Sequence, residues 1–439
     1  MDILVVGGGG REHAICHKLR QSNRANKIYC APGNGGISEI AECVAIKATD
    51  VAGMVRFAAE TPVDFVVVAP DDPLALGMVD ALEAAGIRAF GPRQDAAIIE
   101  SSKAFSKNLM KKYGIPTAEY EIFTDAGAAE SYIREKGAPI VVKADGLALG
   151  KGVVVAADIA QAVGAVDSMM LDGKFGASGS RVVIEECLTG PEVTVLAFTD
   201  GKTIRPMLSS QDHKRAFTGD LGPNTGGMGA FCPSPHYTDE VADICMKSIF
   251  RPTVDAMNSE GRPFKGVLYF GLMLTPNGPR VIEYNARFGD PETQPILTLL
   301  ETDLLDIFEA VEGGRLHELE IKWRCGSACC VVLASGGYPE KYDTGYEITG
   351  IANVPDDIIV FHAGTARSEI ALPDGAPPAG IAGRGIARPC GGSAFVTSGG
   401  RVLGVTAAGE TLEAASARAY EGVSQIHFEK AHFRTDIGR

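Results

Sequence analysis

The sequence lacks a long apolar run, a basic leader and an excess of positive charge. No apolar segment reaches the roughly 20 residues of a membrane-spanning helix, and Met1–Val6 has none of the basic, apolar and cleavage regions of a signal peptide. We therefore expect a protein without a membrane partner whose first residues form a strand. The formal net charge of −14 at pH 7 argues against a nucleic-acid partner, but not against anionic small molecules, which need only local positive charge.

Cysteine spacing typical of a zinc site is also missing. The cysteines are scattered, no Cys-x-x-Cys pair occurs, and no second ligand pair follows Cys325 and Cys329. This usage predicts reduced thiols and a cytoplasmic protein rather than disulfides or bound zinc. The 439 residues, 45% of them hydrophobic, suffice for roughly three globular domains.

Residues 1–102 alternate short apolar runs with helical patterns, which predicts an α/β unit with a parallel sheet. Ligands of such sheets bind beyond the carboxyl ends of the strands. Gly7–Gly10 lies there and favours a bound phosphate over a plain tight turn, whereas Glu12 replaces the third glycine of a dinucleotide fingerprint. Pro32–Gly36 and Pro70–Pro73 should line the same crevice. The expected helices are Arg11–Gln21, Val51–Glu60, Pro73–Ala85 and Gln94–Ser101.

A glycine-rich hairpin is the clearest nucleotide signal in the middle of the chain. The expected strands Pro139–Lys143 and Val153–Ala156 flank Ala144–Gly152, a loop that carries Lys151. Lysine and accessible backbone amides suit a flap over a nucleotide triphosphate, and the alternative is a mobile hairpin with surface lysines. The loop is not a Walker A motif, because its glycine spacing is one residue short and a strand follows it.

Two later segments predict further ligand contacts. Arg181–Leu188 is an expected strand whose Glu185 and Glu186 would bring backbone groups to adenine and a carboxylate to ribose, unless the acidic pair is merely solvated. Ser209–Gly229 is polar and rich in glycine, without a regular pattern, so we expect a shaped functional loop there. Tyr237–Ser259 is expected to form one helix.

The most informative segment is a strand that ends in charged residues. Side chains alternate along a strand, so Val281, Glu283 and Asn285 should share one face and Ile282 and Tyr284 the other. Glu283 and Asn285 then offer a carboxylate and an amide oxygen, the hard ligands that Mg²⁺ takes beside phosphate oxygens. The alternative is an exposed polar strand face.

Arg287 follows this strand in the same phase, and its planar fork of donors suits phosphate or carboxylate. Beyond residue 325, β-branched runs, glycine turns and an expected helix Thr411–Ile426 predict an α+β unit. Ala371–Gly392 is dense in proline and glycine and is expected to be a surface loop.

The joint occurrence of several motifs in order, over nearly the whole chain, resembles the ATP-grasp ligases. The motifs are Gly9-Gly10-Arg11-Glu12-His13, Ala31-Pro32-Gly33-Asn34, Val142-Lys143-Ala144-Asp145-Gly146-Leu147, Ser210-Gln211-Asp212-His213-Lys214-Arg215, Gly222-Pro223-Asn224-Thr225-Gly226-Gly227-Met228-Gly229 and Arg287-Phe288-Gly289-Asp290-Pro291-Glu292. The resemblance implies a multidomain α/β and α+β fold. Its parts would be a pre-ATP-grasp α/β domain at 1–102, an ATP-grasp domain at 103–325 with a mobile lid near 118–189, and a C-terminal α+β domain at 326–439.

Within that family the motifs are most similar to those of ligases that join glycine to 5-phosphoribosylamine. The resemblance implies that ATP phosphorylates the glycine carboxylate and that the amine then displaces phosphate, giving glycinamide ribonucleotide for purine synthesis. It also implies ATP and Mg²⁺ or Mn²⁺ as cofactors, small-molecule partners, and a monomer or weak homodimer. Alternatives are another ATP-grasp carboxylate–amine ligase and a non-catalytic nucleotide-binding module.

The resemblance further assigns roles to individual residues. Catalytic roles fall to Arg287, at the glycine carboxylate or the transferred phosphoryl group, to Lys143 at the phosphates, and to Asp212 at the glycine ammonium. The implied ATP-binding residues are Lys103, Lys143, Gly146, Gly150, Lys151, Gly152, Glu185, Glu186, Leu188, Glu192 and Lys214. The implied substrate-binding residues are Gly9 and Gly10 at the sugar phosphate, with Asn34, Pro70, Asp71, Asp212, Asn224, Gly226, Arg287, Gly289 and Asp290.

The implied metal ligands are Glu283 and Asn285. The sequence departs from many ATP-grasp enzymes at Phe270–Leu274, the preceding strand, which carries no carboxylate. We therefore expect a metal site that uses more water or borrows a distant carboxylate. Ala371–Gly392 also looks longer than the matching family segment.

Overall fold

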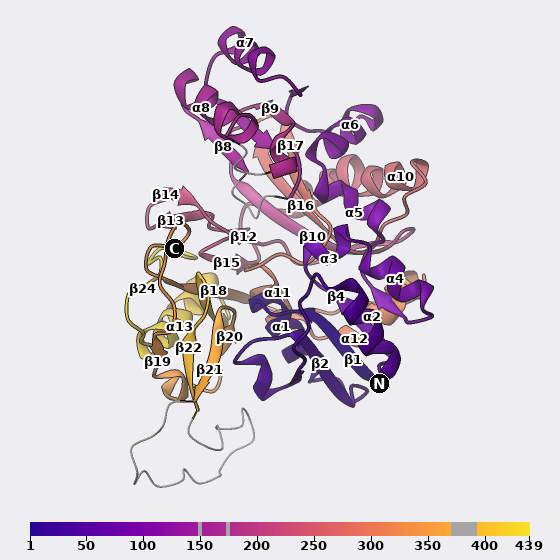
Figure 1. Ribbon diagram of the computed structural model, residues 1–439, viewed down its shortest axis with the longest axis vertical. Helices are drawn as coiled ribbons and strands as arrows, with labels where there is room; N and C mark the ends of the chain where they lie inside the picture. The colour runs from indigo at the N-terminus through magenta and orange to yellow at the C-terminus, as the bar shows by residue number, and fades with distance from the viewer. Residues whose placement is uncertain (148–151, 173–175, 370–392) are drawn as a thin grey trace.

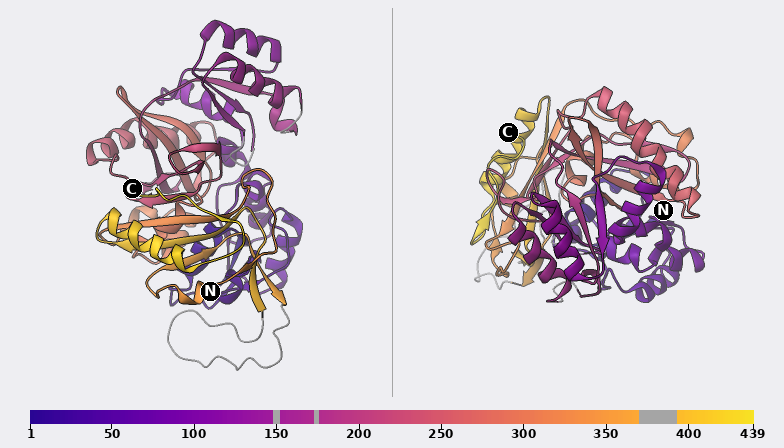
Figure 2. Two further views of the ribbon diagram at one scale, coloured as in Figure 1. Left: turned by 90° about the vertical axis from the view of Figure 1, so that its left-hand side faces the viewer. Right: turned by 90° about the horizontal axis from the view of Figure 1, so that it is seen from above.

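The computed structural model describes residues 1–147, 152–172, 176–369 and 393–439 (Figure 1). The expectations for Gly150, Lys151 and Ala371–Gly392 therefore lie outside the described residues. Within the described ranges, no helix is long and apolar enough to cross a membrane. The molecule is elongated, with helices α7 and α8 at one end and the N-terminal sheet toward the other (Figures 1 and 2).

The N-terminal unit is the predicted parallel sheet, in the order β3-β2-β1-β4-β5. Leu4 and Val6 of β1 belong to one buried cluster and Ile3 and Val5 to another, so this strand is buried on both faces. The strands are β1 (Asp2–Gly7), β2 (Lys27–Pro32), β3 (Glu42–Cys43), β4 (Phe65–Val68) and β5 (Ala89–Phe90), and the helices include α1 (Gly10–Leu19), α2 (Val51–Glu60) and α5 (Gln94–Ser101).

The single helix expected at Pro73–Ala85 is wrong. The segment forms α3 (Asp71–Ala75) and α4 (Met78–Ala84), separated by Gly77 with a φ of 80°. In this left-handed region glycine avoids the clash that a Cβ would suffer, so the first helix ends there. Asp71 consequently lies in the first turn of a short helix that follows β4.

An antiparallel sheet in the order β11-β10-β16-β17 forms the centre of the molecule. Its strands are β10 (Glu192–Asp200), β11 (Ile204–Pro206), β16 (Lys265–Thr275) and β17 (Gly278–Asn285), accompanied by α6 (Lys103–Tyr113), α11 (Thr293–Leu299) and α12 (Leu304–Glu312). The helix expected at Tyr237–Ser259 begins two residues later, where the Thr238 side chain accepts from the Val241 amide. It runs as α9 (Asp239–Cys245), a π-helical turn (Met246–Phe250) and α10 (Arg251–Ser259).

A smaller sheet, β6-β9-β7-β8, lies with α7 and α8 at the far end of the molecule (Figure 1). Its elements are β6 (Tyr120–Phe123), α7 (Ala126–Lys136), β7 (Ile140–Ala144), β8 (Val153–Ala156), α8 (Ile159–Met170) and β9 (Val182–Glu186). Neither helix was expected from the sequence. Each starts after an aspartate whose side chain accepts a backbone N–H, Asp125 for α7 and Asp158 for α8, and this capping signal could have revealed both.

The C-terminal sheet has the order β12-β15-β18-β23-β20, with β24 paired to β18. Its elements are β18 (Ser327–Ser335), β20 (Ile359–His362), β23 (Arg401–Gly409), β24 (Ala431–His432) and α13 (Leu412–Gln425), beside a small sheet of β19 (Glu347–Ile348), β22 (Ser393–Thr397) and β21 (Thr365–Glu369). Two of its strands, β12 (Gln211–Asp212) and β15 (Gly229–Cys232), come from the segment expected to be an irregular loop. That segment also forms the hairpin of β13 (Arg215–Phe217) and β14 (Leu221–Asn224).

The loop expected at Ser209–Gly229 is therefore wrong in part. Its last strand, β15, pairs with β18, which lies about a hundred residues later in the chain, and a local pattern does not show such a partner. The consequence is positional: Asp212, Lys214 and Asn224 are carried by strands or turns that are fixed to the C-terminal sheet.

The alternation expected along β17 is broken by a β-bulge. Glu283 lies opposite Gly271 and Val281 opposite Leu272, so Ile282 is the extra residue. An extra residue shifts the side-chain phase by one, which places Val281 in the same buried cluster as Tyr284. The expected face of Val281, Glu283 and Asn285 is thus wrong for Val281, whereas Glu283 and Asn285 do lie on the same face.

Packed aromatic rings join the N-terminal sheet to the central unit. Phe308 of α12 lies with its ring centroid 4.0 Å from that of Phe90 and 6.2 Å from that of Phe288. Phe308 is fully buried, and Phe288 follows directly after Arg287. This contact therefore holds the end of the charged segment against the N-terminal unit.

We predict that Phe308→Ala lowers the stability of the protein by about 3–5 kcal/mol, because it removes a fully buried ring and leaves a cavity. Thermal and urea unfolding should both show the loss. Leu171→Ala, at a side chain that is 66% exposed, is the control and should change stability by at most about 0.5 kcal/mol. Equal effects of the two changes would contradict this role of the aromatic contact.

Candidate active site

The predicted phosphate turn lies between β1 and α1, but one of its amides is already in use. The Gly9 N–H donates to the Glu12 carboxylate at 2.6 Å. Arg11 lies 2.6 Å from the same carboxylate and donates to the Phe288 carbonyl at 3.0 Å. Arg11 therefore neutralises Glu12 and ties the turn to the segment after β17, so a phosphate at Gly9 and Gly10 would be bound beside a buried ion pair.

Asn34 connects the same turn to the C-terminal unit. Its side-chain amide donates to the Gly8 carbonyl at 3.0 Å and to the His362 carbonyl at 2.8 Å. Its oxygen accepts from the amides of Gly36 and Ile37. These contacts use the polar atoms of Asn34 to shape the loop, and they place the predicted substrate residue next to Gly9 in space.

The face of β17 carries the predicted metal ligands beside a lysine. Lys214 Nζ lies 3.4 Å from Glu283 Oε1 and 3.1 Å from Glu192 Oε2. The pKa of Glu283 is lowered to about 2, mainly by Lys214 against the effect of burial, with help from Lys143 and Lys103. Glu283 is therefore ionised at neutral pH, as a metal-binding carboxylate must be.

Over the described ranges, no group of three or more His, Cys, Asp or Glu side chains could hold a metal ion. A single anionic carboxylate with an amide oxygen nevertheless fits Mg²⁺, which keeps several waters and takes the rest of its ligands from phosphates. The donor set of Glu283 and Asn285 thus fits a nucleotide-bound divalent cation rather than a protein-only metal cage.

Two predicted ATP lysines point toward this face from different elements. Lys143 on β7 donates to the backbone carbonyl of Ile282 at 2.8 Å. Ile282 is the extra residue of the β-bulge. Lys103, at the start of α6, donates to the Gly146 carbonyl at 2.8 Å. At the ends of the glycine-rich loop Ala144–Gly152, the Ala144 amide donates to the Gly152 carbonyl at 2.8 Å.

A buried carboxylate holds Lys143 in place. Glu185 Oε2 lies 3.0 Å from Lys143 and 2.9 Å from Lys107, and all three side chains are less than a tenth exposed. Lys107 also donates to Thr117 Oγ1, and burial lowers its pKa to about 8. Lys107 was not expected from the sequence. The side chain of Glu185 faces Lys107 and Lys143 from β9, the strand predicted to contact adenine.

The remaining residues of the predicted nucleotide edge are more open. Glu186 lies 2.7 Å from Arg280 and accepts from the Glu119 amide at 3.1 Å. Leu188 is half-buried just after β9, and Glu192 at the start of β10 shares Lys214 with Glu283. The structure therefore gathers the edge residues along one side of the lysines.

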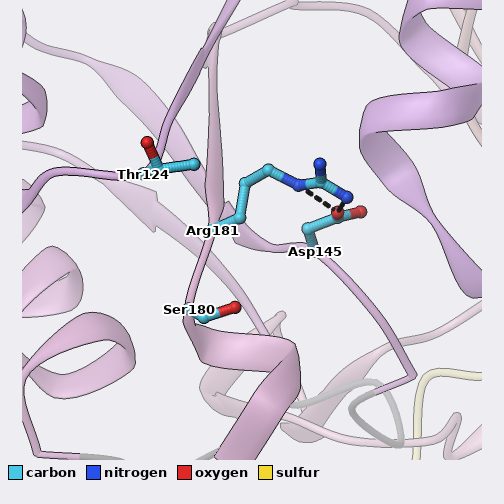
Figure 3. Close-up of a pocket in the computed structure, with 4 residues that line it drawn as sticks. All are labelled: Thr124, Asp145, Ser180 and Arg181. Carbon is cyan, nitrogen blue, oxygen red and sulfur yellow. Dashed lines mark hydrogen bonds and ion pairs between the residues drawn. The ribbon is translucent and has the colours of Figure 1, made fainter.

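A cavity of about 320 Å³ lies beside the small sheet, and Figure 3 shows the residues that line it. It is lined by Thr124, Asp145, Ser180 and Arg181. Asp145 pairs with Arg181 and accepts from the Ala104 amide at 3.0 Å, so it caps α6 next to Lys103. We interpret these contacts of Asp145 as the support that fixes the start of the glycine-rich loop against α6.

Arg287 lies between two carboxylates. Its Nη2 is 3.0 Å from Glu100 Oε1 and 3.8 Å from Asp71 Oδ2, and its Nε is buried without a hydrogen-bond partner in the described structure. Glu100, which the sequence analysis missed, also accepts from the Ala286 amide at 2.7 Å. Pro70 precedes Asp71 at the start of α3, so the Arg287–Asp71 contact places this predicted substrate segment beside Arg287.

The last predicted substrate residues come from the hairpin and from the turn after Arg287. Asp212 on β12 has its pKa raised to about 8 by burial, against the effect of Lys214. Asn224 ends β14 opposite Arg215, and the buried carboxylate of Glu292 lies over Gly289. Asp290 and Gly226 are joined by Arg401 of β23, a residue that no local sequence pattern singled out.

Profiles of three phosphoribosylglycinamide synthetase domains match consecutive parts of this chain. The N domain matches residues 1–100, the ATP-grasp (A) domain 101–293 and the C domain 328–439. A phosphoribosylamine–glycine ligase from Halalkalibacterium halodurans is 46% identical over 438 residues, covering 100% of this chain and 96% of the relative. One from Caulobacter vibrioides is 48% identical over 440 residues, covering 100% and 98%.

Solved structures agree with these sequence matches. The phosphoribosylamine–glycine ligase of Thermotoga maritima superposes with a TM-score of 0.82 at 32% identity, covering 99% of this chain and 100% of that one. The biotin carboxylase domain of a Hydrogenobacter thermophilus 2-oxoglutarate carboxylase, solved with MgADP and bicarbonate, has a TM-score of 0.70 at 15% identity, covering 98% and 91%. The second likeness shows the fold alone.

The buried Glu100 predicts a pH-dependent stability. Burial raises the pKa of Glu100 to about 7, although Arg287 opposes the shift, from an ordinary value of 4.5. Between these values the folded state holds a proton that the unfolded state lacks, so this contribution to stability is lost as pH rises through the window. We expect the urea midpoint of the wild type to fall relative to that of Glu100→Gln between pH 5 and 7. Glu60→Gln, at an exposed carboxyl, should follow the wild type, and parallel curves for wild type and Glu100→Gln would contradict the prediction.

Proposed function

This chain belongs to the phosphoribosylglycinamide synthetase family, the ATP-grasp ligases of purine biosynthesis, and from that premise we propose that it joins glycine to 5-phosphoribosylamine. The observation that carries the proposal is the order of charges around β17. Lys214, Lys143 and Lys103 lie around Glu283, the proposed metal ligand, and Arg287 follows shortly after Asn285 in the chain. Cations for a triphosphate therefore adjoin a donor fork for a carboxylate.

In the first step, a glycine carboxylate oxygen attacks the γ-phosphorus of ATP, and ADP leaves. Lys143 and Lys103 would neutralise the phosphates, because each is fixed by a backbone carbonyl and faces Glu283. Glu283 and Asn285 would hold Mg²⁺ or Mn²⁺, which supplies positive charge shared between phosphate oxygens. Arg287 would orient the glycine carboxylate, and Asp212 its ammonium group.

In the second step, the amine of 5-phosphoribosylamine attacks the carbonyl carbon of glycyl phosphate, and phosphate leaves. The sugar phosphate would bind at Gly9 and Gly10, which Arg11 ties to the Phe288 backbone close to Arg287. This arrangement supports a common site in which acceptor and acyl phosphate meet without a covalent enzyme intermediate. The enzyme's contribution is then positioning and charge neutralisation.

The proposal is tested by measuring ADP release with and without each substrate. Purified protein should release ADP at an appreciable rate only when ATP, Mg²⁺, glycine and freshly formed 5-phosphoribosylamine are all present, and the product should be glycinamide ribonucleotide by mass spectrometry. Equal release without either substrate would contradict the proposal. A panel of other amino acids in the same assay distinguishes a related carboxylate–amine ligase.

We predict that Glu283→Gln raises the Mg²⁺ concentration for half-maximal turnover by about tenfold or more, because the metal loses its one anionic protein ligand. Turnover should be titrated with Mg²⁺ at fixed, saturating substrates. The exposed Glu60→Gln is the matched control and should keep the wild-type titration. A Glu283→Gln enzyme with the wild-type Mg²⁺ dependence would remove Glu283 from the metal site.

A further inference from the structure

Arg401 lies on β23 of the C-terminal sheet, yet its guanidinium reaches two predicted substrate loops. Its Nη1 donates to the Asp290 carbonyl at 2.7 Å and to the Gly226 carbonyl at 2.8 Å. Its Nη2 lies 3.3 Å from Asp290 Oδ2. A guanidinium presents several donors in a fixed plane, so one side chain can fix both loops at once.

Tyr338, which follows β18, holds the same glycine from the other side. The Gly226 N–H donates to the Tyr338 hydroxyl at 3.1 Å, while its carbonyl accepts from Arg401. Gly227 has a φ of 113°, and a Cβ built there would lie 2.4 Å from Pro291 Cδ. The loop at Gly226 and Gly227 is therefore pressed directly against the turn that carries Asp290, and the C-terminal unit supplies the two contacts to Gly226 described here.

Asp290 lies between Arg401 and the predicted phosphate turn at Gly9 and Gly10. A Cβ built on Gly9 would lie 3.5 Å from Asp290 Oδ2, and one built on Gly10 3.6 Å from Oδ1. Gln294 donates to Asp290 Oδ1 at 2.8 Å. Burial opposes ionisation, but Arg401 and Arg11 outweigh it, and the pKa of Asp290 is lowered. An ionised carboxylate only accepts hydrogen bonds, which suits the hydroxyls of a sugar rather than its phosphate.

We infer that Arg401 and Tyr338 are positioning residues for the phosphosugar half of the active site, where they hold Gly226 and Asp290 so that the Asp290 carboxylate accepts from the ribose hydroxyls. The inference rests on the proposed function and deepens it. The C-terminal unit then contributes to acceptor binding through Arg401 on β23 and through Tyr338 in the turn after β18. In the described part of the chain, the hydrogen bonds and ion pair that fix Gly226 and Asp290 do not involve Lys103, Lys143 or Lys214.

The test separates binding of the phosphosugar from binding of the nucleotide. We expect Arg401→Met to raise the KM for 5-phosphoribosylamine by about tenfold, since it removes charge-assisted hydrogen bonds to both loops. The KM for ATP should change by less than about twofold, because the nucleotide site is a separate part of the cleft. Calorimetry with ribose 5-phosphate and with ADP gives the same comparison without turnover.

Conservative variants keep the test informative if Arg401→Met folds poorly. Arg401→Lys keeps one charge but not the planar fork, and Tyr338→Phe removes only the acceptor for the Gly226 amide, so each should weaken ribose 5-phosphate binding by a smaller factor. Arg418→Met is the matched control, because Arg418 is an arginine of the C-terminal unit that pairs with Asp357 and Glu421 at the surface. It should leave all constants unchanged.

The possible outcomes are distinct. Wild-type enzyme without phosphoribosylamine-dependent turnover would overturn the proposed function itself. An active wild type together with unchanged ribose 5-phosphate affinity in Arg401→Met and Tyr338→Phe would overturn the positioning role. A parallel loss of ADP affinity, ribose 5-phosphate affinity and thermal stability would show a purely structural role and would overturn it as well.

Discussion

The β-bulge at Ile282 is the constraint on which the candidate site depends. Without it, Glu283 and Asn285 would share a face with Val281, whose side chain is fully buried in the core. The extra residue lets Val281 pack inward with Tyr284, while Glu283 lies on the other face of the strand, beside Lys214. It also frees the Ile282 carbonyl to accept from Lys143. One inserted residue thus aligns the proposed metal ligands with Lys143, the lysine proposed to bind phosphate.

The site also depends on the balance between buried cations and carboxylates. The chain carries a net charge of −14, yet the site gathers cations, and Lys143, Lys107, Lys214 and Arg287 are each paired with a carboxylate. Glu185 pairs with Lys143 and Lys107. Glu283 and Glu192 both pair with Lys214, and these four contacts measure 2.9–3.4 Å. Arg287 lies 3.0 Å from Glu100 and 3.8 Å from Asp71. Buried cations without such partners would cost several kcal/mol each. The carboxylates therefore make a cation-rich site compatible with folding.

Local patterns in the sequence were enough for the parallel N-terminal sheet, for the shared face of Glu283 and Asn285, and for the glycine hairpin with Lys143 at its start. They failed where a distant partner decides the structure. Strand β15 forms because β18 supplies its hydrogen bonds, and β12 in turn pairs with β15. The bulge lies where β16 places Gly271 opposite Glu283. Glu100, Lys107 and Arg401 were missed for the same reason, since each acquires its role only through contacts with residues far along the chain.

The same long-range contacts explain why the site involves all parts of the chain. The phosphate turn is tied to the segment after β17 through Arg11 and Phe288, and Asn34 connects that turn to His362 of the C-terminal sheet. Unsupported loops would lose conformational entropy each time they adopted the binding geometry. With these hydrogen bonds, that entropy is lost once, during folding. In the proposed two-step reaction with a labile acyl phosphate, an acceptor site formed during folding would favour attack by the amine as soon as the intermediate appears. This supports a view of the C-terminal sheet as a wall of the active site rather than an appended support.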